Sequence, residues 1–474
     1  MKFDNDRCHF VGVAGSGMSA LAQFFAMEGV HVSGSDRSFD QDLGGDIRRK
    51  LENGGIRIFP QDGSALGGLP GSVVVSTAIE TENPDIRKAV KLGLPIRHRA
   101  EVLAAVAREH KTVAVAGTSG KSTVAAMIHD IYARTRSRIS VITGGPIVSL
   151  RDDGLLGNAY NAKTELLVIE ADESDGSLVH YDSPRLSVLL NLTKDHKEIA
   201  QLQSIFGAFL KKSPHILLNA DDRNLSDFSA GSFYDSVGLK SPRLATFGFG
   251  TALYRAEFVD IGPAASKMSV NGVLFNVPVP GRHNAQNALA AAAACAELGV
   301  SLEDCSRGLE GFKGVSRRLE LVGECGGVQV IDDFAHNPEK IRAALETVQM
   351  RSQRVLAVYQ PHGFYPTRFL KRELIEAFST GLRNADRLWM PDIYYAGGSS
   401  QQDVSSGDIA GPVRKSGRQA AHVPERKQII PEIVETARPG DAVLVMGARD
   451  PSLHGFAEEI LRALCLSFSA AGRS

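Results

Sequence analysis

Seven consecutive residues combine the groups that bind a nucleotide phosphate: Gly117-Thr118-Ser119-Gly120-Lys121-Ser122-Thr123. They follow the apolar segment TVAVAG and lead into a helical pattern. Backbone N–H groups at a helix start, together with the helix dipole, attract phosphate oxygens. Lys121 supplies positive charge for the β- and γ-phosphates, and the Ser122 hydroxyl suits Mg²⁺. The motif is shorter than G-x-x-x-x-G-K-[ST] counted from Gly117, and a plain capping turn is the alternative. The flanking strand and helix favour a phosphate site.

Acidic side chains follow the next apolar segments. The stretch LLVIEADESD places Glu170 and Asp172 directly after a strand pattern, and Asp195 and His196 follow LSVLLNLTK. Carboxylates in such positions are costly unless they are solvated, paired or bound to metal. Either cluster alone would be interpreted as an exposed strand end. Beside a phosphate loop, however, a carboxylate is the natural Mg²⁺ ligand.

A second glycine turn lies near the amino terminus, where HFVGVAG runs into Gly12-Val13-Ala14-Gly15-Ser16-Gly17. It departs from G-x-G-x-x-G because Ala14 replaces the middle glycine. Asp36 ends the following strand pattern, at the position of the ribose-binding acid in dinucleotide folds. The turn predicts a site for a phosphate-bearing nucleotide, and a tight turn without a ligand is the alternative.

Three further segments combine polar residues with a helix start or a strand end. They are Gly281-Arg282-His283-Asn284, Ser316-Arg317-Arg318 and Asp332-Asp333-Phe334-Ala335-His336-Asn337-Pro338. Each has a plain structural interpretation as a capped helix, a solvated basic turn or an acidic loop. Taken alone, none of them indicates a ligand.

These residues need strands and helices that bring their ends together. Strand patterns alternate with helical patterns in three successive segments, which predicts an α/β fold with parallel sheets. The carboxyl ends of parallel strands frame a ligand crevice, and the polar groups described above follow such ends. The third segment begins near residue 314 and contains VQVIDD, RVLAVYQPH, DRLWMPDIYY and DAVLVMGARD. Residues 397–400 are expected to form a loop.

Composition excludes several classes of protein. The 474 residues suit about three domains at roughly 150 residues each. With 53 basic and 54 acidic residues the net charge is −1, so no binding to nucleic acid is expected. The five cysteines are scattered without a C-x-x-C pair, so neither a zinc ribbon nor a disulfide scaffold is expected. No apolar run suits a membrane span and no signal-peptide pattern opens the chain, so a cytoplasmic protein without membrane insertion is expected.

Taken in order along the chain, these motifs resemble those of the Mur ligase family. The resemblance rests on HFVGVAGSGMSALA, VSGSD, VVVSTAIETENPDI, HRAEVLA, VAVAGTSGKST, EADESD, GRHNAQNALAA, SRRLE, DDFAHNP, QPHGFYPTR, DIYYAGG and DAVLVMGARD. It covers essentially the whole chain and implies a three-domain α/β architecture with parallel Rossmann-like sheets. The implied domains are a UDP-sugar-binding domain at residues 1–108, a central P-loop ATPase domain at 109–315 and a carboxy-terminal ligase domain at 316–474 that closes over ATP.

The resemblance also implies ATP and Mg²⁺ (or Mn²⁺) as cofactors, and a role for individual residues. Residues 117–123 with Asn284, Arg318 and Asp333 would bind ATP. Ser122, Glu170 and His196 would hold the metal, and Lys121, Arg318 and His336 would act in catalysis. The substrate would contact Gly12, Gly15, Ser16, Gly17, Asp36 and His336; Arg368 is added to this set from its sequence position alone.

The implied reaction joins an amine to UDP-N-acetylmuramate. The muramoyl carboxylate attacks the γ-phosphate of ATP, and the amine then attacks the resulting acyl phosphate, so positioning and charge neutralisation dominate catalysis. Within the family, the motifs are most similar to those of the branch that adds L-alanine in peptidoglycan synthesis. Addition of murein tripeptide is the alternative, so the expected partners are UDP-N-acetylmuramate and an amino acid or peptide.

Several positions depart from the alanine-adding branch. Ser119 and Asn337 stand where His is usual, and Gly363-Phe364 stand where Arg-Tyr is usual. Phe206 lies near the position at which several Mur ligases carry a carbamylated lysine. The departures leave the ATP chemistry intact but leave the acceptor open. Arg368 is a candidate replacement for the missing cation, and Gly363→Arg is expected to tighten binding of the standard substrate.

Two other functions compete with a ligase. A nicotinamide oxidoreductase would use the first glycine turn, but the Gly-Lys-Ser segment and the lack of a clear hydride-transfer group oppose it. A nucleotide-binding regulatory protein with a degenerate ligase fold would have lost its phosphate and metal residues. Lys121, Ser122, Glu170 and His196 are all present.

Overall fold

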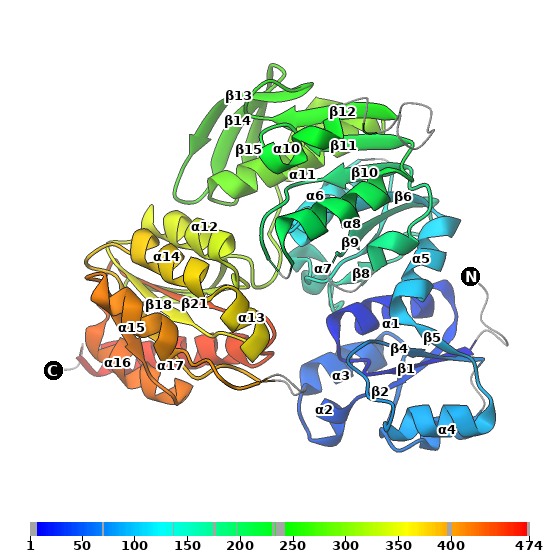
Figure 1. Cartoon of the computed structure of the whole chain (residues 1–474), viewed down its shortest axis with the longest axis horizontal. Coiled ribbons are helices and arrows are strands. Elements are labelled where there is room, and N and C mark those ends of the chain that lie inside the picture. Colours follow the sequence, from blue (N-terminus) through cyan, green and yellow to red (C-terminus); the bar gives the residue numbers. More distant parts are fainter. Residues whose placement is uncertain are drawn as a thin grey trace. The chain divides into compact units, whose positions relative to one another are not determined.

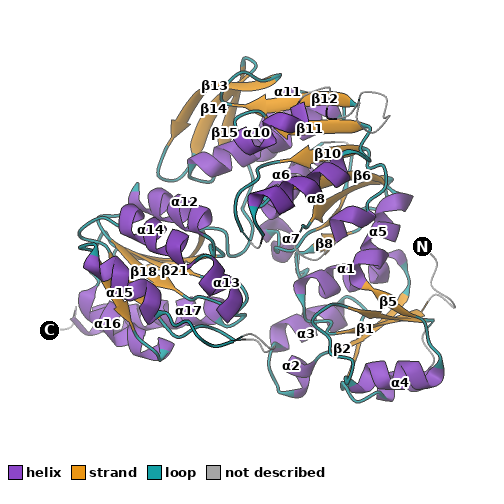
Figure 2. Ribbon diagram, viewed as in Figure 1, coloured by secondary structure: helices purple, strands orange, loops and turns teal. Residues whose placement is uncertain are grey.

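The computed structural model describes residues 7–68, 71–135, 137–173, 177–195, 197–229, 233, 242–395 and 401–471. Helices and strands alternate through this part of the chain, and Figure 2 shows helices packed along the sheets. Three sheets of five, ten and six strands confirm the predicted α/β fold with parallel sheets. The metal ligand predicted at His196 and the loop predicted at residues 397–400 lie outside the described residues.

The first sheet, in the blue part of Figure 1, has the order β3-β2-β1-β4-β5 with parallel pairing throughout. Its strands are β1 (Arg7–Val11), β2 (His31–Ser35), β3 (Arg57–Phe59), β4 (Ser72–Val75) and β5 (Ile96–His98). The helices are α1 (Ser16–Glu28), α2 (Arg37–Asp40), α3 (Gly45–Asn53), α4 (Pro84–Leu92) and α5 (Arg99–Glu109). The predicted strand–turn–helix at the first glycine motif is present as β1 followed by α1.

The second sheet has the order β15-β14-β13-β12-β11-β10-β6-β9-β7-β8. Its strands are β6 (Lys111–Ala116), β7 (Ser140–Ile142), β8 (Ala159–Tyr160), β9 (Leu166–Ala171), β10 (Leu186–Leu189), β11 (His215–Asn219), β12 (Arg243–Gly248), β13 (Tyr254–Ile261), β14 (Ser266–Val270) and β15 (Val273–Val277). The helices are α6 (Lys121–Ala133), α7 (Val148–Asp152), α8 (Ile199–Leu210), α10 (Arg282–Glu297) and α11 (Leu302–Leu309). Sequence patterns did not predict strands β12 to β15, which extend the parallel centre of the sheet at one edge.

The third sheet has the order β16-β17-β21-β18-β19-β20, and only the β16 pairing is antiparallel. Its strands are β16 (Glu320–Cys325), β17 (Val328–Asp333), β18 (Val355–Tyr359), β19 (Arg387–Met390), β20 (Gln419–His422) and β21 (Ala442–Met446). The helices are α12 (Pro338–Gln349), α13 (Phe364–Phe369), α14 (Lys371–Gly381), α15 (Gly407–Lys415), α16 (Ile429–Thr436) and α17 (Leu453–Ala471).

Burial on both faces explains why the strands of the third sheet are continuous apolar runs. In β18, Val355 and Ala357 belong to the cluster formed with α12, α14 and α15, whereas Leu356 and Val358 belong to the cluster formed with α16 and α17. A parallel sheet covered on both faces has no polar side. Polar side chains are therefore concentrated at the strand ends, where a ligand site can form.

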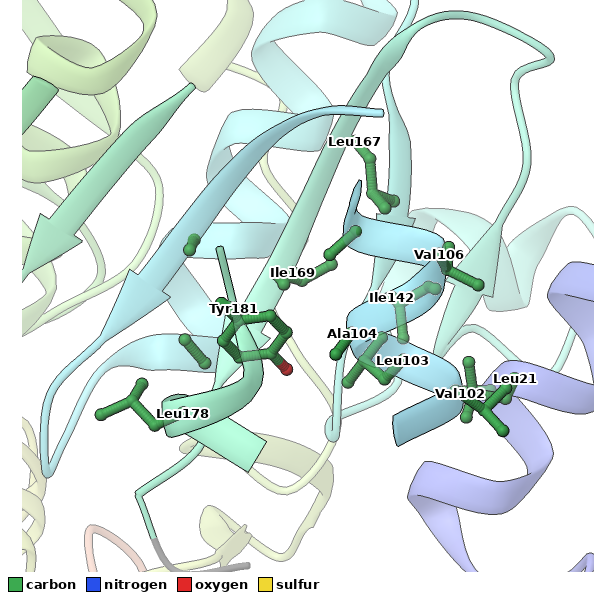
Figure 3. Packing of buried hydrophobic residues seen from close by; sticks show 14 of the residues in the cluster. Leu21, Val102, Leu103, Ala104, Val106, Ile142, Leu167, Ile169, Leu178 and Tyr181 are labelled. Carbon is green, nitrogen blue, oxygen red and sulfur yellow. The ribbon is translucent and has the colours of Figure 1, made fainter. Parts of the chain in front are cut away.

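The described chain divides into two compact units. One contains the first two sheets up to Val315, and the other contains the third sheet from Ser316 onward together with residues 261–266 and 279–283. A single hydrophobic cluster joins the first two sheets. Figure 3 shows Leu21 of α1 and Leu103 of α5 in this cluster with Ile142 of β7. The domain boundary predicted between residues 108 and 109 therefore falls inside one compact unit, and the domain limits stay predictions.

One disulfide bond is present, although the spacing of the cysteines gave no reason to expect one. Cys325 of β16 and Cys465 of α17 are bonded, with Cα atoms 5.5 Å apart, whereas Cys8, Cys295 and Cys305 are buried thiols. Their separation of 140 residues hid the pair from a search for short spacings. No helix in the described part of the chain has the length and apolar character needed to cross a membrane.

A buried carboxylate ties the amino ends of three strands in the second sheet to α10. Glu297 accepts hydrogen bonds from His215 at 2.6 Å and from Tyr254 at 2.6 Å, and pairs with Arg243 at 2.8 Å. Its side chain is 1% exposed. Burial lowers the pKa of His215 despite this carboxylate, so the imidazole is a neutral donor at pH 7.

We expect Glu297→Ala to lower the free energy of unfolding by about 3 kcal/mol, because it leaves buried donors without their acceptor. Denaturant unfolding measures this loss. Glu257→Ala, which removes an exposed carboxylate from β13, is the matched control and should change stability by less than about 0.5 kcal/mol. Equal stability of the two variants would contradict the role assigned to Glu297.

Candidate active site

The phosphate loop joins the end of β6 to the start of α6, at the carboxyl edge of the second sheet. Lys121 Nζ donates to Gly117 O at 2.7 Å and to Glu173 Oε2 at 2.6 Å, with Asp172 Oδ1 at 3.8 Å. Burial by itself would lower the pKa of Lys121, but the carboxylates of Glu173, Asp172 and Glu170 outweigh it and raise the pKa above its usual value. The lysine is therefore a cation at the start of a helix, with a side chain that is 14% exposed.

Asn191 holds this loop in shape, and sequence analysis missed it. It follows β10, the strand paired with β6, and its Oδ1 accepts hydrogen bonds from Thr118 Oγ1 at 2.9 Å and from the Ser119 N–H at 2.8 Å. Its Nδ2 donates to Ser119 O at 3.0 Å. An asparagine just after a strand in NLTKDH was the available signal, but only the pairing of β10 with β6 shows what it contacts.

The second turn of α10 lies against the phosphate loop, residues 117–123. Gly120 has φ +88°, and a Cβ atom there would collide with Asn287 Oδ1. Only glycine adopts this conformation without strain and also admits the amide. Asn287 Nδ2 is 3.4 Å from Asn284 Oδ1, so the predicted adenine-side residue Asn284 lies in the preceding turn, beside the loop.

Glu170, the predicted metal ligand, ends β9 next to the loop. Its Oε1 accepts hydrogen bonds from Thr143 Oγ1 and from the Gly144 N–H at 3.0 Å. Because both bonds end on Oε1, the carboxylate is oriented while Oε2 is not committed by them. Ser122, the second predicted ligand, is 5% exposed and lies under Gly145. The metal role of these residues stays a prediction.

The first glycine turn is built by Asp36 and joined to the second sheet by Asn158. Asp36 accepts hydrogen bonds from the Ala14 N–H at 2.9 Å and from Ser38, so its carboxylate shapes the turn. Asn158 Nδ2 donates to Ser16 O at 2.7 Å, and its backbone oxygen accepts from the Thr143 N–H at 2.9 Å. Asn158 thus links the start of α1 to Thr143, the residue that orients Glu170.

A cavity of about 200 Å³ connects the two motifs within the first compact unit. It is lined by Gly15, Ser16, Gly17, Met18, Ala20, Ser76, Arg99, Leu103, Ile142, Thr143, Gly144, Glu170 and Asp172. Arg99, the only Lys or Arg in this lining, lies against Gly17, where a Cβ atom would come within 2.6 Å of Nη1. Arg99 belongs to the segment HRAEVLA, and no pattern within that segment marks it as a site residue. The structure brings the predicted sugar-side glycines and the predicted metal carboxylate to one cavity.

The remaining predicted residues lie in the second compact unit. Asp333 ends β17 and accepts hydrogen bonds from the Leu319 N–H and the Ala335 N–H, each at 2.7 Å. Burial raises the pKa of Asp333 to about 6, although Arg318 acts in the opposite direction. Arg318 places its guanidinium carbon 4.8 Å from the ring centroid of Phe334. Arg318 and Asp333 thus lie close together, as the resemblance implies.

His336 belongs to a group of aromatic rings at the same sheet edge. Its ring centroid is 5.5 Å from that of His362 and 5.6 Å from that of Phe334. Asn337, which departs from the His expected at this position in the alanine-adding branch, is the N-cap of α12 and accepts a hydrogen bond from the Lys340 N–H at 3.0 Å. Asn337 is therefore a structural residue here.

Gly363 corrects one sequence-based expectation. It has φ +68°, and a Cβ atom would lie 3.2 Å from Pro366 Cδ. Gly363→Arg would strain the backbone before it restored a charge, so the expected gain in substrate binding does not follow. Arg368, the candidate replacement cation, pairs with Asp403 at 2.6 Å. Phe206 is fully buried in the core.

The donor set fits ATP and Mg²⁺. Ser119 Oγ is buried without a hydrogen-bond partner among the described residues, next to the N–H groups of the loop. A phosphate oxygen would satisfy such a donor, and Lys121 adds a positive charge. Glu170 and Ser122 offer the hard oxygen ligands that Mg²⁺ prefers.

Three sequence patterns of one family match the chain in succession. They are the catalytic domain of the Mur ligase family at residues 7–111, the Mur ligase middle domain at 115–295 and the glutamate ligase domain of Mur ligases at 317–449. The chain belongs to the Mur ligase family.

Individual relatives agree with this assignment. This Mur ligase is 35% identical over 455 residues to the UDP-N-acetylmuramate–L-alanine ligase of Pelotomaculum thermopropionicum, covering 93% of the chain and 94% of the relative. It is 35% identical over 463 residues to the enzyme of the same name from Cyanothece sp., covering 93% and 92%. The solved UDP-N-acetylmuramate-alanine ligase MurC of Thermotoga maritima matches with a TM-score of 0.75 and 26% identity, over 96% of this chain and 98% of that one.

We expect Asn191→Ala to raise the KM of this Mur ligase for ATP about tenfold, because the three side-chain hydrogen bonds that hold the loop are lost at a net cost of about 1.4 kcal/mol. Initial rates at varied ATP give the value. Asn219→Ala is the control, since Asn219 donates to Leu190 O at the neighbouring strand end without a hydrogen bond to the loop. A KM for ATP that changes equally in both variants would refute the assignment.

We expect the affinity for Mg·ADP to fall as the pH drops through about 6, where Asp333 becomes protonated and loses an acceptor oxygen. Its folded pKa lies above the unfolded value, so the same protonation stabilises the folded state over that range. Affinity and the stability contribution of this group therefore change in opposite directions. Calorimetric titration between pH 5 and 7.5 should show this loss of Mg·ADP affinity at low pH in the parent and not in Asp333→Asn. A pH dependence unchanged in that variant would exclude Asp333 as its source.

Proposed function

We propose that this chain is an ATP-dependent ligase that forms the amide bond between UDP-N-acetylmuramate and L-alanine, with Mg²⁺ and in the cytoplasm. The observation that carries the proposal is the single cavity that joins the glycine turn of α1 to Glu170 beside the phosphate loop. A nucleotide-sugar acid and a transferable phosphate can meet there. The curated relatives named UDP-N-acetylmuramate–L-alanine ligase, at 32–35% identity over nearly the whole chain, support this choice of substrates.

In the first step, the chain brings a carboxylate to the γ-phosphate of ATP. The carboxylate oxygen forms a bond to phosphorus, the bond from phosphorus to the ADP oxygen breaks, and ADP leaves with that electron pair. Lys121 and the N–H groups at the start of α6 stabilise charge on the phosphate oxygens. Bound Mg²⁺ would neutralise further phosphate charge, with Ser122 and Glu170 as the proposed ligands.

In the second step, the amine nitrogen attacks the acyl carbon and phosphate leaves. The amine loses a proton as the amide forms. No protein nucleophile is needed, because the acyl phosphate is already activated. The contribution of the chain is to hold the two reacting groups in line, which accounts for a site made of glycine turns and oriented carboxylates.

Arg99 is the proposed anion-binding residue of the cavity. Its guanidinium lies at the start of α1, where the helix dipole also favours negative charge. The carboxylates of Glu170 and Asp172 line the same cavity and would otherwise repel an acidic substrate. Arg99 therefore offsets them on the path that the nucleotide-sugar acid occupies.

The proposal is tested by offering the purified chain UDP-N-acetylmuramate, ATP and Mg²⁺ with L-alanine, glycine, L-serine or L-alanyl-γ-D-glutamyl-diaminopimelate in separate reactions. We expect ADP release and a coupled product mass with L-alanine. Product with the tripeptide alone would replace L-alanine as the acceptor. Absence of product with every acceptor would refute the proposed function.

We expect Lys121→Ala to abolish ADP formation while the protein still folds and unfolds cooperatively, because the lost charge acts on the transferred phosphate. Lys111→Ala is the matched control, since Lys111 begins β6 and pairs with Glu165 at the surface. The control should keep the parental rate. If Lys121→Ala formed ADP at nearly that rate, the role of Lys121 in phosphate transfer would be refuted.

A further inference from the structure

Two residues beside Arg318 have a backbone conformation that L-amino acids rarely adopt. Arg317 has φ +58° and Leu319 has φ +51°. Each costs free energy, because Cβ is crowded against the backbone in this region. Such a conformation persists only where surrounding contacts impose it.

The side chain of Arg317 supplies those contacts. Its Nε lies 3.1 Å from Asp332 Oδ2, and the carboxylate is fully buried. Its Nη2 donates to Gly447 O at 2.8 Å and its Nη1 to Ala448 O at 3.2 Å. The guanidinium thus connects the segment just before β16 to β17 and to the loop after β21.

The backbone of Arg317 is held from both sides as well. The Arg317 N–H donates to Glu320 Oε2 at 2.8 Å, and Arg317 O accepts from the Phe334 N–H at 2.7 Å. His454 Nδ1 lies 3.0 Å from Asp332 Oδ2, on the same carboxylate as Arg317. Asp332 therefore receives two donors and stays in place.

Glu320, Asp332 and His454 also have the spacing of a three-ligand metal site. A cation there would lie close to the guanidinium of Arg317, which already pairs with Asp332 Oδ2. Like charges at this distance repel. We therefore interpret these three side chains as an ion-pair network around Arg317, not as a metal site.

The network fixes the two residues that lie next to it in the chain. Leu319, two residues after Arg317, donates its N–H to Asp333 Oδ2 at 2.7 Å. Arg318, between them, lies over the ring of Phe334, whose own N–H is bonded to Arg317 O. A change in the backbone at Arg317 would move the guanidinium of Arg318 and remove a hydrogen bond from Asp333.

We propose that Arg317 is a positioning residue for nucleotide binding: its pairing with Asp332 and the carbonyls of residues 447 and 448 holds Arg318 and Asp333 in the geometry that contacts ATP. The inference rests on the proposed function, in which those two residues face the nucleotide. Arg317 itself need not touch the nucleotide. Its effect is confined to the second compact unit, whereas the sugar-side cavity is built from residues of the first.

The test compares Arg317→Ala with Arg354→Ala. Arg354 forms an equivalent buried pair in the same sheet, with Nη2 2.6 Å from Asp441 Oδ2 and 3.0 Å from Thr436 O, but at the amino ends of β18 and β21. Both variants should lose stability. Only Arg317→Ala should weaken Mg·ADP binding by tenfold or more and raise the KM for ATP, while the KM for UDP-N-acetylmuramate stays within twofold of the parent.

Rescue separates positioning from loss of fold. Guanidinium or methylguanidinium ion at millimolar concentration should restore part of the Mg·ADP affinity to Arg317→Ala and leave the affinity of Arg354→Ala unchanged. If Arg317→Ala does not fold, Arg317→Lys and Asp332→Asn are measured instead, with the same selective loss expected. Equal Mg·ADP affinity in the Arg317 and Arg354 variants would overturn the inference. Parental protein that binds Mg·ADP but forms no amide would refute the proposed function alone.

Discussion

A positive charge has to stay buried at the start of α6, and much of the first compact unit is arranged around it. Burial alone would drive the Lys121 ammonium toward its neutral form, and the carboxylates of Glu173, Asp172 and Glu170 prevent this. Those carboxylates also repel an incoming phosphate. The site is therefore balanced: helix dipole, backbone donors and a divalent cation offset the same negative charge that keeps the lysine ionised.

The strand ends explain how much of this could be predicted from sequence. A glycine turn between a strand and a helix has a local signature, so the residue order alone was enough to locate the loop at Gly117 and the turn at Gly12. Glu170 was found because it follows an apolar run. In each case the residues that mark the site are adjacent in sequence, and the parallel sheet places them at its carboxyl edge.

The residues that sequence analysis missed act across the fold. Asn191 contacts the loop because β10 pairs with β6, and Asn158 reaches α1 from a segment more than a hundred residues away. An isolated Asn or Arg has no periodicity or motif that marks it. The departure at Gly363 was visible in sequence, but its cause was not, since a positive φ at a helix start is a property of the folded backbone. The disulfide between Cys325 and Cys465 was hidden for the same reason.

The shared core under α1 and α5 has a consequence for how this enzyme can be divided or recombined. Leu21, Leu103 and Ile142 pack together although they come from stretches that match two separate family patterns. If residues 7–111 were replaced by those of a distant relative, the new α5 would have to pack against the original β7. The new α1 would also have to offer Asn158 the hydrogen-bond acceptor that Ser16 O provides here. The first two sheets are therefore one exchangeable block that ends near Val315. Asn337 and Gly363, which depart from the alanine-adding branch, both belong to the other compact unit.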